Sequence, residues 1–364
     1  MSGRGTRRDR LRPGDPNDPN DPSDRGDPGA NSGPARHVPV LLSAVLEALE
    51  PKSGETYIDG TFGAGGYTRA ILEAADCRVI AIDRDPLAAV TAASFEKEFG
   101  DRFCFIPGRF GELTALIGAL GVEQVEGVVL DVGVSSMQID DPVRGFSFAQ
   151  DGPLDMRMSC RGLSAADVVN QFSEADIARI IAALGEERRA RVIARAIVAD
   201  RGVKPFTTTL QLADLVTSVI GRRPGAAKHP ATRTFQALRI YVNRELEELA
   251  RGLEASEQLL SVGGRVVIVS FHSLEDRIVK QFLNNRAIPK SRPSRHLPDS
   301  VEADQFKPSF ALINKRTITP TREEQEQNPR ARSSRLRAAT RLDAPAFPFS
   351  LDEVKIPRTP DPDF

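Results

Sequence analysis

The sequence predicts an α/β domain built on a parallel sheet, with an all-helical segment inserted into it. Short apolar runs alternate with helical patterns along the first part of the chain, which is typical of parallel strands joined by helical crossovers. Three of these runs end in an acid, at Asp59, Asp83 and Asp131. Ligands of such sheets bind at the carboxyl ends of the strands, so we expect the three acids to line one rim.

The chain divides into five segments by its patterns. Residues 1–36 are rich in proline and aspartate and contain too few apolar residues to fold, so we expect a disordered tail. Residues 37–140 and 231–285 carry the strand and helix patterns of the sheet domain. Residues 141–230 show helical periodicity without a strand and form the predicted insertion. Residues 286–364 are rich in proline and arginine, and we expect a basic, mostly irregular segment.

Two further expectations concern the helices. Ser164 and Ser173 each precede a helical pattern, and serine is a favoured residue at a helix N-cap. A single long helix is expected from about Thr232 to Leu260, directly before the last predicted strand at 265–271.

The composition excludes several classes of protein. The 364 residues carry a formal net charge of −1, so overall charge indicates no partner. No apolar run approaches the ~18 residues that span a bilayer, and the N-terminal tail lacks the apolar stretch of a secretory signal. Cys77, Cys104 and Cys160 share no metal-ligand spacing and are expected to be reduced thiols. We therefore expect a cytoplasmic protein that has no metal site and no membrane anchor.

The segment TYIDGTFGAGG at 56–66 predicts a cofactor site. An apolar run leads into a glycine-rich turn and then a helical pattern, an arrangement that lets backbone N–H groups approach a ligand. Asp83 follows Gly65 by 18 positions, near the ~20-residue offset at which an acid meets ribose hydroxyls. The pattern fits a dinucleotide or S-adenosylmethionine, and a purely structural turn is the alternative. No phosphate-directed lysine follows the turn, which excludes a P-loop.

Unusual strings extend from about residue 37 to 338. They are HVPVLL at 37–42, YIDGTFGAGGYT at 57–68, AIDRDP at 81–86, DVGVSSMQIDDPVRGFSFAQDGPLDMRM at 131–158, GEERRARVIARAIV at 185–198, KHPATRTFQALRIYVNRELEEL at 228–249, GGRVVIVSFHSLEDRIVK at 263–280 and NPRARSSRLR at 328–337. In these strings the chain resembles the bacterial small-subunit ribosomal RNA cytosine-N4 methyltransferases of the RsmH/MraW type.

The resemblance implies a class I S-adenosylmethionine-dependent methyltransferase, a Rossmann-like α/β sheet with an inserted all-helical domain. Residues 37–140 and 231–285 then form two parts of the methyltransferase domain, and 141–230 its substrate domain. The implied reaction transfers a methyl group from S-adenosylmethionine to the exocyclic N4 amine of a cytidine in 16S ribosomal RNA. The implied cofactor contacts are Gly63, Gly65, Gly66, Tyr67, Asp83, Phe110, Asp131 and Gln138.

Asp131 is the candidate catalytic residue. Hydrogen-bond acceptors on the N–H groups of the target amine would expose its lone pair, and a carboxylate can serve as one. His272, which follows the last predicted strand, is a second candidate, although a lone histidine is more often scaffold. DNA amino-methyltransferases place prolines and a stacking ring after the acid, and this chain does not. Phe146 and Phe148 are candidates for that ring, with packing of the insertion as the alternative.

Three groups of basic residues are candidates for binding RNA phosphates. They are Arg188, Arg191 and Arg195 on one helix face, Lys228, His229 and Arg233 before the long helix, and Arg330, Arg332, Arg335 and Arg337 near the end. A solvated helix face is the alternative interpretation of such charges. For the last group we favour RNA, because NPRARSSRLRAATR contains no acid to neutralise its arginines.

Other functions stay open on the sequence alone. An NAD-dependent oxidoreductase uses a similar sheet, and binding of labelled S-adenosylmethionine against NAD separates the two. A non-catalytic ribosome-assembly or RNA-binding module that retains the cofactor is another alternative, and only the resemblance argues against a DNA or different RNA substrate. The expected partner is the small ribosomal subunit or its 16S RNA, and no membrane partner is expected. Assembly into a homodimer is left open.

Overall fold

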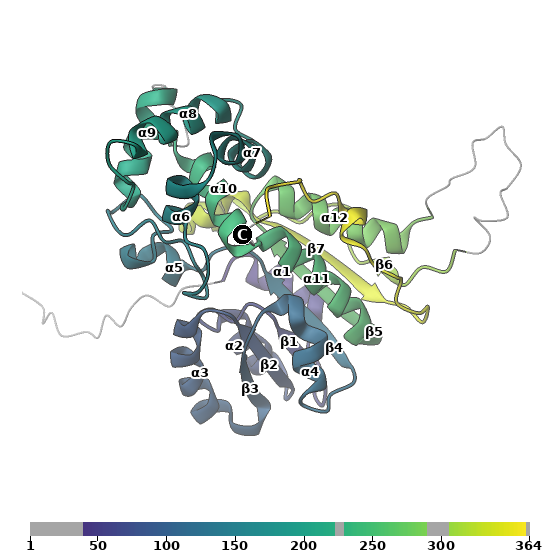
Figure 1. The fold of residues 1–364 in the computed structure, drawn as a ribbon. Helices are drawn as coiled ribbons and strands as arrows, with labels where there is room; N and C mark the ends of the chain where they lie inside the picture. Colours follow the sequence, from purple (N-terminus) through teal and green to yellow (C-terminus); the bar gives the residue numbers. More distant parts are fainter. Residues whose placement is uncertain (1–38, 223–228, 290–305, 362–364) are drawn as a thin grey trace, which may run out of the picture. The chain divides into compact units, whose positions relative to one another are not determined.

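The computed structural model describes residues 39–222, 229–289 and 306–361. The proline-rich tail at 1–36 and Lys228, for which predictions were made, lie outside these ranges. The strands form one seven-stranded sheet in the order β3-β2-β1-β4-β5-β7-β6 (Figure 1). They are β1 (Thr56–Asp59), β2 (Arg78–Asp83), β3 (Phe103–Pro107), β4 (Val125–Asp131), β5 (Leu260–Ser270), β6 (Phe310–Leu312) and β7 (Arg335–Arg341). Strands β1 to β5 run parallel, and β7 is antiparallel to both of its neighbours.

Helices cover both faces of the sheet, because alternate residues of each strand enter different hydrophobic cores. In β4, Val128 and Leu130 belong to one core, and Val129 between them belongs to the other. The first core includes α4 (Leu113–Gly118), α11 (Glu245–Leu259) and α12 (Ser273–Ala287). The second includes α1 (Leu42–Leu49), α2 (Gly66–Ala74) and α3 (Pro86–Phe99). This sheet covered on both faces confirms the predicted fold class.

The predicted insertion consists of helices in the described residues, joined by loops. After α5 (Ser136–Asp140) come α6 (Ala165–Gln171), α7 (Glu174–Gly185), α8 (Ala190–Arg201) and α9 (Thr209–Ile220). Ser164 and Ser173 cap α6 and α7 as expected, because each hydroxyl accepts a hydrogen bond from the backbone N–H three residues later. In Figure 1 these helices gather together with α10 (Thr232–Asn243), which packs against α6 and α7.

The expected long helix from Thr232 to Leu260 is wrong. It breaks at Arg244, which takes a left-handed conformation with φ of 51° and separates α10 from α11. Neither glycine nor proline marks the break. The buried side chain of Asn243 stabilises it by donating to the Met156 carbonyl at 2.7 Å and accepting from the Met158 N–H at 2.8 Å. Because α10 packs on the insertion, we propose that the inserted domain ends at Asn243 rather than at residue 230.

The expectation of a mostly irregular C-terminal segment is also wrong in part. Residues 335–341 form β7, which pairs with β5 along six positions, and 310–312 form β6 at the edge. Two arginines of β7, Arg335 and Arg337, pair with Asp276 of α12 at 2.9 and 2.7 Å, while Leu336 and Ala338 are buried. The acid that neutralises the arginines of this strand is therefore distant in sequence, so the neighbouring residues alone did not indicate a strand here.

Candidate functional site

The glycine-rich segment forms a tight turn between β1 and α2 at the carboxyl edge of the sheet. Gly65 has φ of 78° and precedes the first residue of α2, and its N–H donates to the Phe62 carbonyl at 2.7 Å. Gly63, with φ of 51°, would place a Cβ no closer than 3.8 Å to any neighbour. The turn is therefore open beside Gly63.

Gly65 and Gly66 are required by packing on the protein side of the turn. A Cβ on Gly65 would lie 2.3 Å from the ring of Phe95 and 2.9 Å from that of Phe62. A Cβ on Gly66 would lie 2.3 Å from Pro39. These approaches are shorter than any real contact, so only glycine fits. The close approach of a ligand, which the sequence suggested as the reason for these glycines, is not needed to explain them.

Asp83 ends β2 directly beside this turn. Its Oδ2 accepts a hydrogen bond from the Gly63 N–H at 2.7 Å, and its Oδ1 accepts from the Asp85 N–H at 2.8 Å. Each carboxylate oxygen has a second lone pair, so the side chain keeps acceptor capacity for two hydroxyl groups. The structure therefore brings together the predicted turn and the predicted ribose acid.

Asp59 and Asp131 end the two adjacent strands β1 and β4. Thr68 donates to Asp59 at 2.7 Å, and the Thr61 N–H donates to the same carboxyl at 3.1 Å. Thr61 in turn accepts from the Asp131 N–H at 2.7 Å. Asp131 keeps part of its surface exposed, but its Oδ1 is enclosed and has no hydrogen-bond partner in the described part of the chain.

The pKa of each of these three acids is raised above its ordinary value. Burial raises the pKa of Asp59 to about 6, and the neighbouring Asp83 adds to the effect. Burial raises the pKa of Asp83 as well, although two backbone N–H groups partly oppose it. Burial, followed by the carboxylates of Asp59 and Glu275, raises the pKa of Asp131 well above its usual value. A cationic ligand at this rim would relieve the repulsion among these acids.

Three other predicted cofactor residues already have protein partners. Tyr67 is buried in α2, and its hydroxyl donates to the Val40 carbonyl. Phe110 is half-buried and packs against Gly252 of α11, where a Cβ would lie 2.5 Å from its ring. Gln138 accepts from the Ser135 N–H at 3.0 Å and donates to Asp85 at 2.7 Å. Their contacts with a cofactor stay predictions.

His272 caps α12 and faces Glu275. Its Nδ1 accepts from the Glu275 N–H at 3.4 Å, and Glu275 Oε2 accepts from the backbone N–H groups of Phe271 and His272 at 2.8 and 3.1 Å. The other carboxylate oxygen of Glu275 lies 2.9 Å from His272 Nε2. This reciprocal cap gives His272 a structural role.

Glu245 completes a group of possible metal donors with His272 and Glu275, whose ligand atoms lie within 4.8 Å of one another. Arg239 already donates to both oxygens of Glu245, at 2.9 and 2.8 Å. The Arg239 guanidinium therefore supplies a positive charge at this cluster. Among the described residues, Cys77, Cys104 and Cys160 are free thiols.

The three basic groups differ in their surroundings. Arg188, Arg191 and Arg195 are exposed, and Arg195 pairs with Glu174 at 3.7 Å. The prediction that all three lie on one helix face is wrong for Arg188, because α8 begins only at Ala190. Arg233 lies 3.7 Å from Glu187. Burial lowers the pKa of His229, which argues against a charged ring at neutral pH.

The predicted absence of acids around the last arginines is wrong for three of them. Arg330 pairs with Asp140, and both Arg335 and Arg337 pair with Asp276. Arg332 is exposed. These partners come from α5 and α12, far away in the sequence, and they weaken the argument for RNA at these positions.

The two candidate stacking rings also have partners. The Phe148 ring lies 4.7 Å from those of both His229 and Phe235, measured between centroids. The Arg144 guanidinium lies 5.8 Å from the Phe146 ring centroid. Packing therefore accounts for both phenylalanines, and their stacking on a base stays a prediction.

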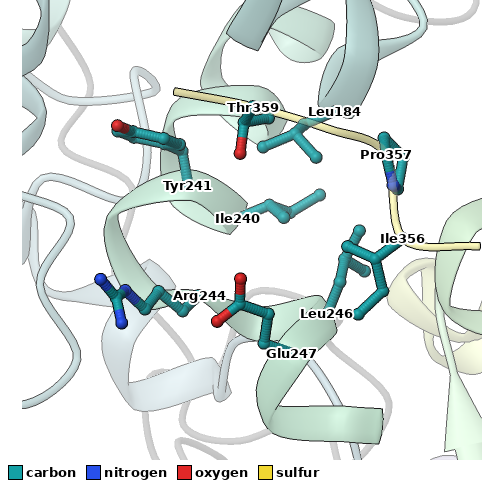
Figure 2. A pocket seen from close by; sticks show the side chains of 9 residues that line it. All are labelled: Leu184, Ile240, Tyr241, Arg244, Leu246, Glu247, Ile356, Pro357 and Thr359. Carbon is teal, nitrogen blue, oxygen red and sulfur yellow. The ribbon is translucent and has the colours of Figure 1, made fainter. Parts of the chain in front are cut away.

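A separate pocket lies where the C-terminal segment crosses the break between α10 and α11 (Figure 2). Its wall is mostly apolar and is formed by Leu184, Ile240, Tyr241, Arg244, Leu246, Glu247, Ile356, Pro357 and Thr359. The Tyr241 hydroxyl donates to the Pro360 carbonyl at 3.2 Å and holds the segment there. None of the predicted cofactor residues lines this pocket.

The sequence interpretation omitted several residues that shape the rim. Asp85 is buried, caps α3, and binds both Gln138 and Arg144. Its position before Pro86 is a sequence signal for an N-cap. Glu275 has no comparable signal for its proximity to Asp131, since the two are 144 residues apart. Among the described helices, none is long and apolar enough to cross a bilayer.

Comparison with known proteins identifies the family. Residues 34–342 match the model of the MraW methylase family. The chain is 58% identical over 323 residues to ribosomal RNA small subunit methyltransferase H of Parvibaculum lavamentivorans, covering 89% of this chain and 94% of that protein. It is 54% identical over 314 residues to the protein of the same name from Paramagnetospirillum magneticum, covering 86% and 98%.

Among solved structures, a putative rRNA methylase from Clostridium thermocellum aligns over 84% of this chain and 100% of that one. Its identity is 12% and its TM-score is 0.40. The fold assignment accordingly rests on the strand order and on the family match. Because the family model spans most of the chain and the relatives share more than half of their residues with it, the chain belongs to the MraW methylase family.

Proposed function

We propose that this chain transfers the methyl group of S-adenosylmethionine to the exocyclic N4 amine of a cytidine in 16S ribosomal RNA of the small subunit. The observation that carries the proposal is the rim of Asp59, Asp83 and Asp131, whose pKa values are all raised. S-adenosylmethionine is a sulfonium cation with an adenosine ribose. Its charge complements this rim, and its ribose hydroxyls match the remaining acceptor capacity of Asp83. The relatives' names support the small-subunit RNA as substrate.

The residues present fit the cofactor in chemical terms. Asp131 contributes an enclosed carboxyl oxygen without a partner in the described residues, and such an atom is costly unless a ligand completes it. Gly63 leaves the turn open beside Asp83. When bound, S-adenosylmethionine supplies a methyl group that its sulfonium makes electrophilic.

The remaining chemistry concerns the target amine. The N4 lone pair is delocalised into the cytosine ring, so it must be freed before it can attack. We assign Asp131 as the acceptor for an N4 hydrogen, which localises the lone pair on nitrogen. The N4 lone pair then forms the new N–C bond as the C–S bond breaks, and sulfur keeps the electron pair of the broken bond. One N4 proton then passes to solvent water, which restores a neutral methylated base.

Two exposed arginines near the start of α8 give the proposal an RNA-binding surface. Arg191 lies in α8 and Arg188 in the turn before it, both in the helical insertion and outside the sheet, and arginine binds phosphate through charge and hydrogen bonds. The target base must leave its helix to reach a buried rim, as in other base-modifying enzymes. With a ribosomal substrate the reaction belongs in the cytoplasm, and a homodimer is not required by any contact described.

The test uses purified protein, small ribosomal subunits, naked 16S RNA and methyl-labelled S-adenosylmethionine. Nucleosides from the digested RNA are separated and identified by mass spectrometry. Labelled N4-methylcytidine is expected. Label in another nucleoside would contradict the target atom, and cofactor binding without any label would favour the ribosome-assembly module. Binding of NAD in place of S-adenosylmethionine would favour the oxidoreductase.

A further inference from the structure

Glu275 is held rigidly at the start of α12. Its Oε2 accepts from two backbone N–H groups, those of Phe271 and His272, while His272 Nδ1 accepts from the Glu275 N–H. The side chain is 2% exposed. Its Oε1 is enclosed, lies 2.9 Å from His272 Nε2, and makes no other polar contact in the described residues. These contacts therefore hold the Glu275 carboxylate in a single position.

This position is next to the loop that begins at Asp131. Strands β4 and β5 are paired, with Asp131 opposite Val269, so the two loops that follow them are adjacent. A Cβ on Gly133 would lie 3.9 Å from Glu275 Oε1 and 3.7 Å from the Phe271 ring. Glycine at 133 thus lets the loop after β4 lie directly against Glu275.

The two carboxyl groups have opposite electrostatic surroundings. Asp131 faces Asp59 of β1, Tyr67 of α2 and Glu275 of α12. Glu275 faces His272 of its own turn, Arg239 of α10 and the Glu245 carboxylate. Burial raises the pKa of Glu275, but His272, Arg239 and the Phe271 N–H lower it further, and the net shift is downward. Within this pair, the surroundings of Glu275 favour its carboxylate form, and those of Asp131 favour its protonated form.

We propose that Glu275 is a positioning residue of the methyl-transfer site, which acts through its charge on Asp131 so that binding of the sulfonium cation, and not folding, converts Asp131 into a carboxylate. The inference rests on the function proposed above. Asp131 becomes the stronger, charged acceptor for an N4 hydrogen once its own proton has left for solvent. The charged acceptor is then formed only when the methyl donor is in place, and the proton lost is the only group transferred in this step.

Calorimetry measures that proton directly. S-adenosylmethionine is titrated into the full chain at one pH near neutral, in phosphate and in Tris, whose heats of ionisation differ. The dependence of the binding heat on the buffer gives the number of protons released. About one proton per bound S-adenosylmethionine is expected for the wild type. S-adenosylhomocysteine lacks the sulfonium charge and is expected to release fewer.

Variants identify the residue that releases the proton and test how Glu275 affects that release. Asp131→Asn should abolish the release. Glu275→Gln should reduce it, because Asp131 then loses a negative neighbour and is already partly ionised in the free protein. Glu275→Asp keeps the charge and should restore the release. Asp167→Asn is the matched control, because Asp167 occupies the same position of the capping box at the start of α6 and is not among the groups that act on Asp131.

The outcomes are distinct. A wild type that binds S-adenosylmethionine without releasing a proton overturns the inference, and so does a folded Glu275→Gln variant with wild-type release. Should that variant fail to fold, Glu275→Ala decides in the same assay, because it leaves no amide facing His272. Failure of the wild type to bind S-adenosylmethionine at all contradicts the proposed function instead.

Discussion

Arg144 donates two hydrogen bonds from one guanidinium nitrogen to the carboxylate of Asp85, at 3.1 and 2.8 Å. Both side chains are buried, and Arg144 also donates to the carbonyls of Arg157 and Met158. Asp85 lies two residues after Asp83, the predicted ribose-binding acid, whose Oδ1 accepts from the Asp85 N–H. This ion pair therefore connects the first part of the predicted substrate domain to the loop that positions Asp83.

Arg144→Ala is expected to destabilise the protein by about 3–5 kcal/mol, because it leaves a buried carboxylate without its cation. It should also weaken binding of S-adenosylmethionine, since the loop that carries Asp83 loses an anchor. Denaturant unfolding and calorimetry measure the two effects. The control is Arg322→Ala, which removes an exposed ion pair with Glu326 and should change stability by at most about 0.5 kcal/mol. Equal effects of the two variants would contradict the anchoring role.

Gly65→Ala is expected to destabilise the turn and abolish cofactor binding. The new Cβ would collide with the rings of Phe95 and Phe62, and the residue would keep a φ of 78° that alanine rarely adopts. Gly118→Ala is the control, because its Cβ would meet nothing within 4 Å at the end of α4. Thermal unfolding with and without S-adenosylmethionine distinguishes them, and a Gly65→Ala variant that is stabilised normally by the cofactor would refute the account of the turn.

Asp59 makes the ligand-free protein less stable as the pH rises. Its pKa is raised by burial from 3.8 to about 6 in the folded state, so folding retains a proton that the unfolded chain releases. The cost is absent below the unfolded pKa, develops as the pH rises through this window, and is complete above pH 6, on the order of 2–3 kcal/mol. Asp59→Asn should therefore be more stable than the wild type at pH 7 and equal to it near pH 4. A variant that is less stable at pH 7 would show that the charge of Asp59 is favourable.

Asp276 should show the opposite sign. Burial raises the pKa of Asp276, but Arg337 and Arg335 lower it further and the net shift is downward. Its stabilisation is present above the unfolded pKa and is lost as the pH falls through the folded pKa. Asp276→Asn should destabilise the protein at pH 7, and the difference should shrink as the pH falls below 4. Unfolding free energies measured across this range check the prediction, and a difference that is independent of pH would contradict it.

The exposed Arg191 of α8 and Arg188 of the turn before it should act on RNA and not on stability. The double variant Arg188→Ala and Arg191→Ala is expected to weaken binding to small ribosomal subunits. The slope of log K against log salt should fall by about 1.4–1.8, as two phosphate contacts would give. Arg337→Ala is the contrasting control, because it breaks the ion pair with Asp276. It should lower the stability of the protein and leave the salt slope nearly unchanged. An unchanged slope in the double variant would show that Arg188 and Arg191 face solvent and make no phosphate contacts.

Much of the fold was predictable from local patterns. The acids Asp59, Asp83 and Asp131 ended apolar runs and do lie at the carboxyl ends of β1, β2 and β4. The break at Arg244 was not predictable, because a non-glycine residue takes the left-handed conformation there and the compensating contacts come from Asn243 to Met156 and Met158. Tertiary contacts decided this element against its helical propensity.

The site shows the same division. The sequence predicted that the glycine-rich turn and Asp83 lie together at the carboxyl edge of the sheet, and they do, because that edge follows from strand order. It interpreted the arginines of 330–337 as unneutralised, because Asp140 and Asp276 approach them only in the folded chain. It also missed the influence of Glu275 on Asp131, which depends on the pairing of β4 with β5. Charge pairing across distant segments has no local signature, so the sequence could not reveal it.

The most direct measurement is a crystal structure with bound S-adenosylhomocysteine. The account predicts ribose hydroxyls within hydrogen-bond distance of Asp83 and the amino-acid part of the ligand over the turn at Gly63–Gly66. Ligand density elsewhere, for example in the pocket under Ile356 and Pro357 (Figure 2), with the rim of Asp59, Asp83 and Asp131 left without it, would contradict the account.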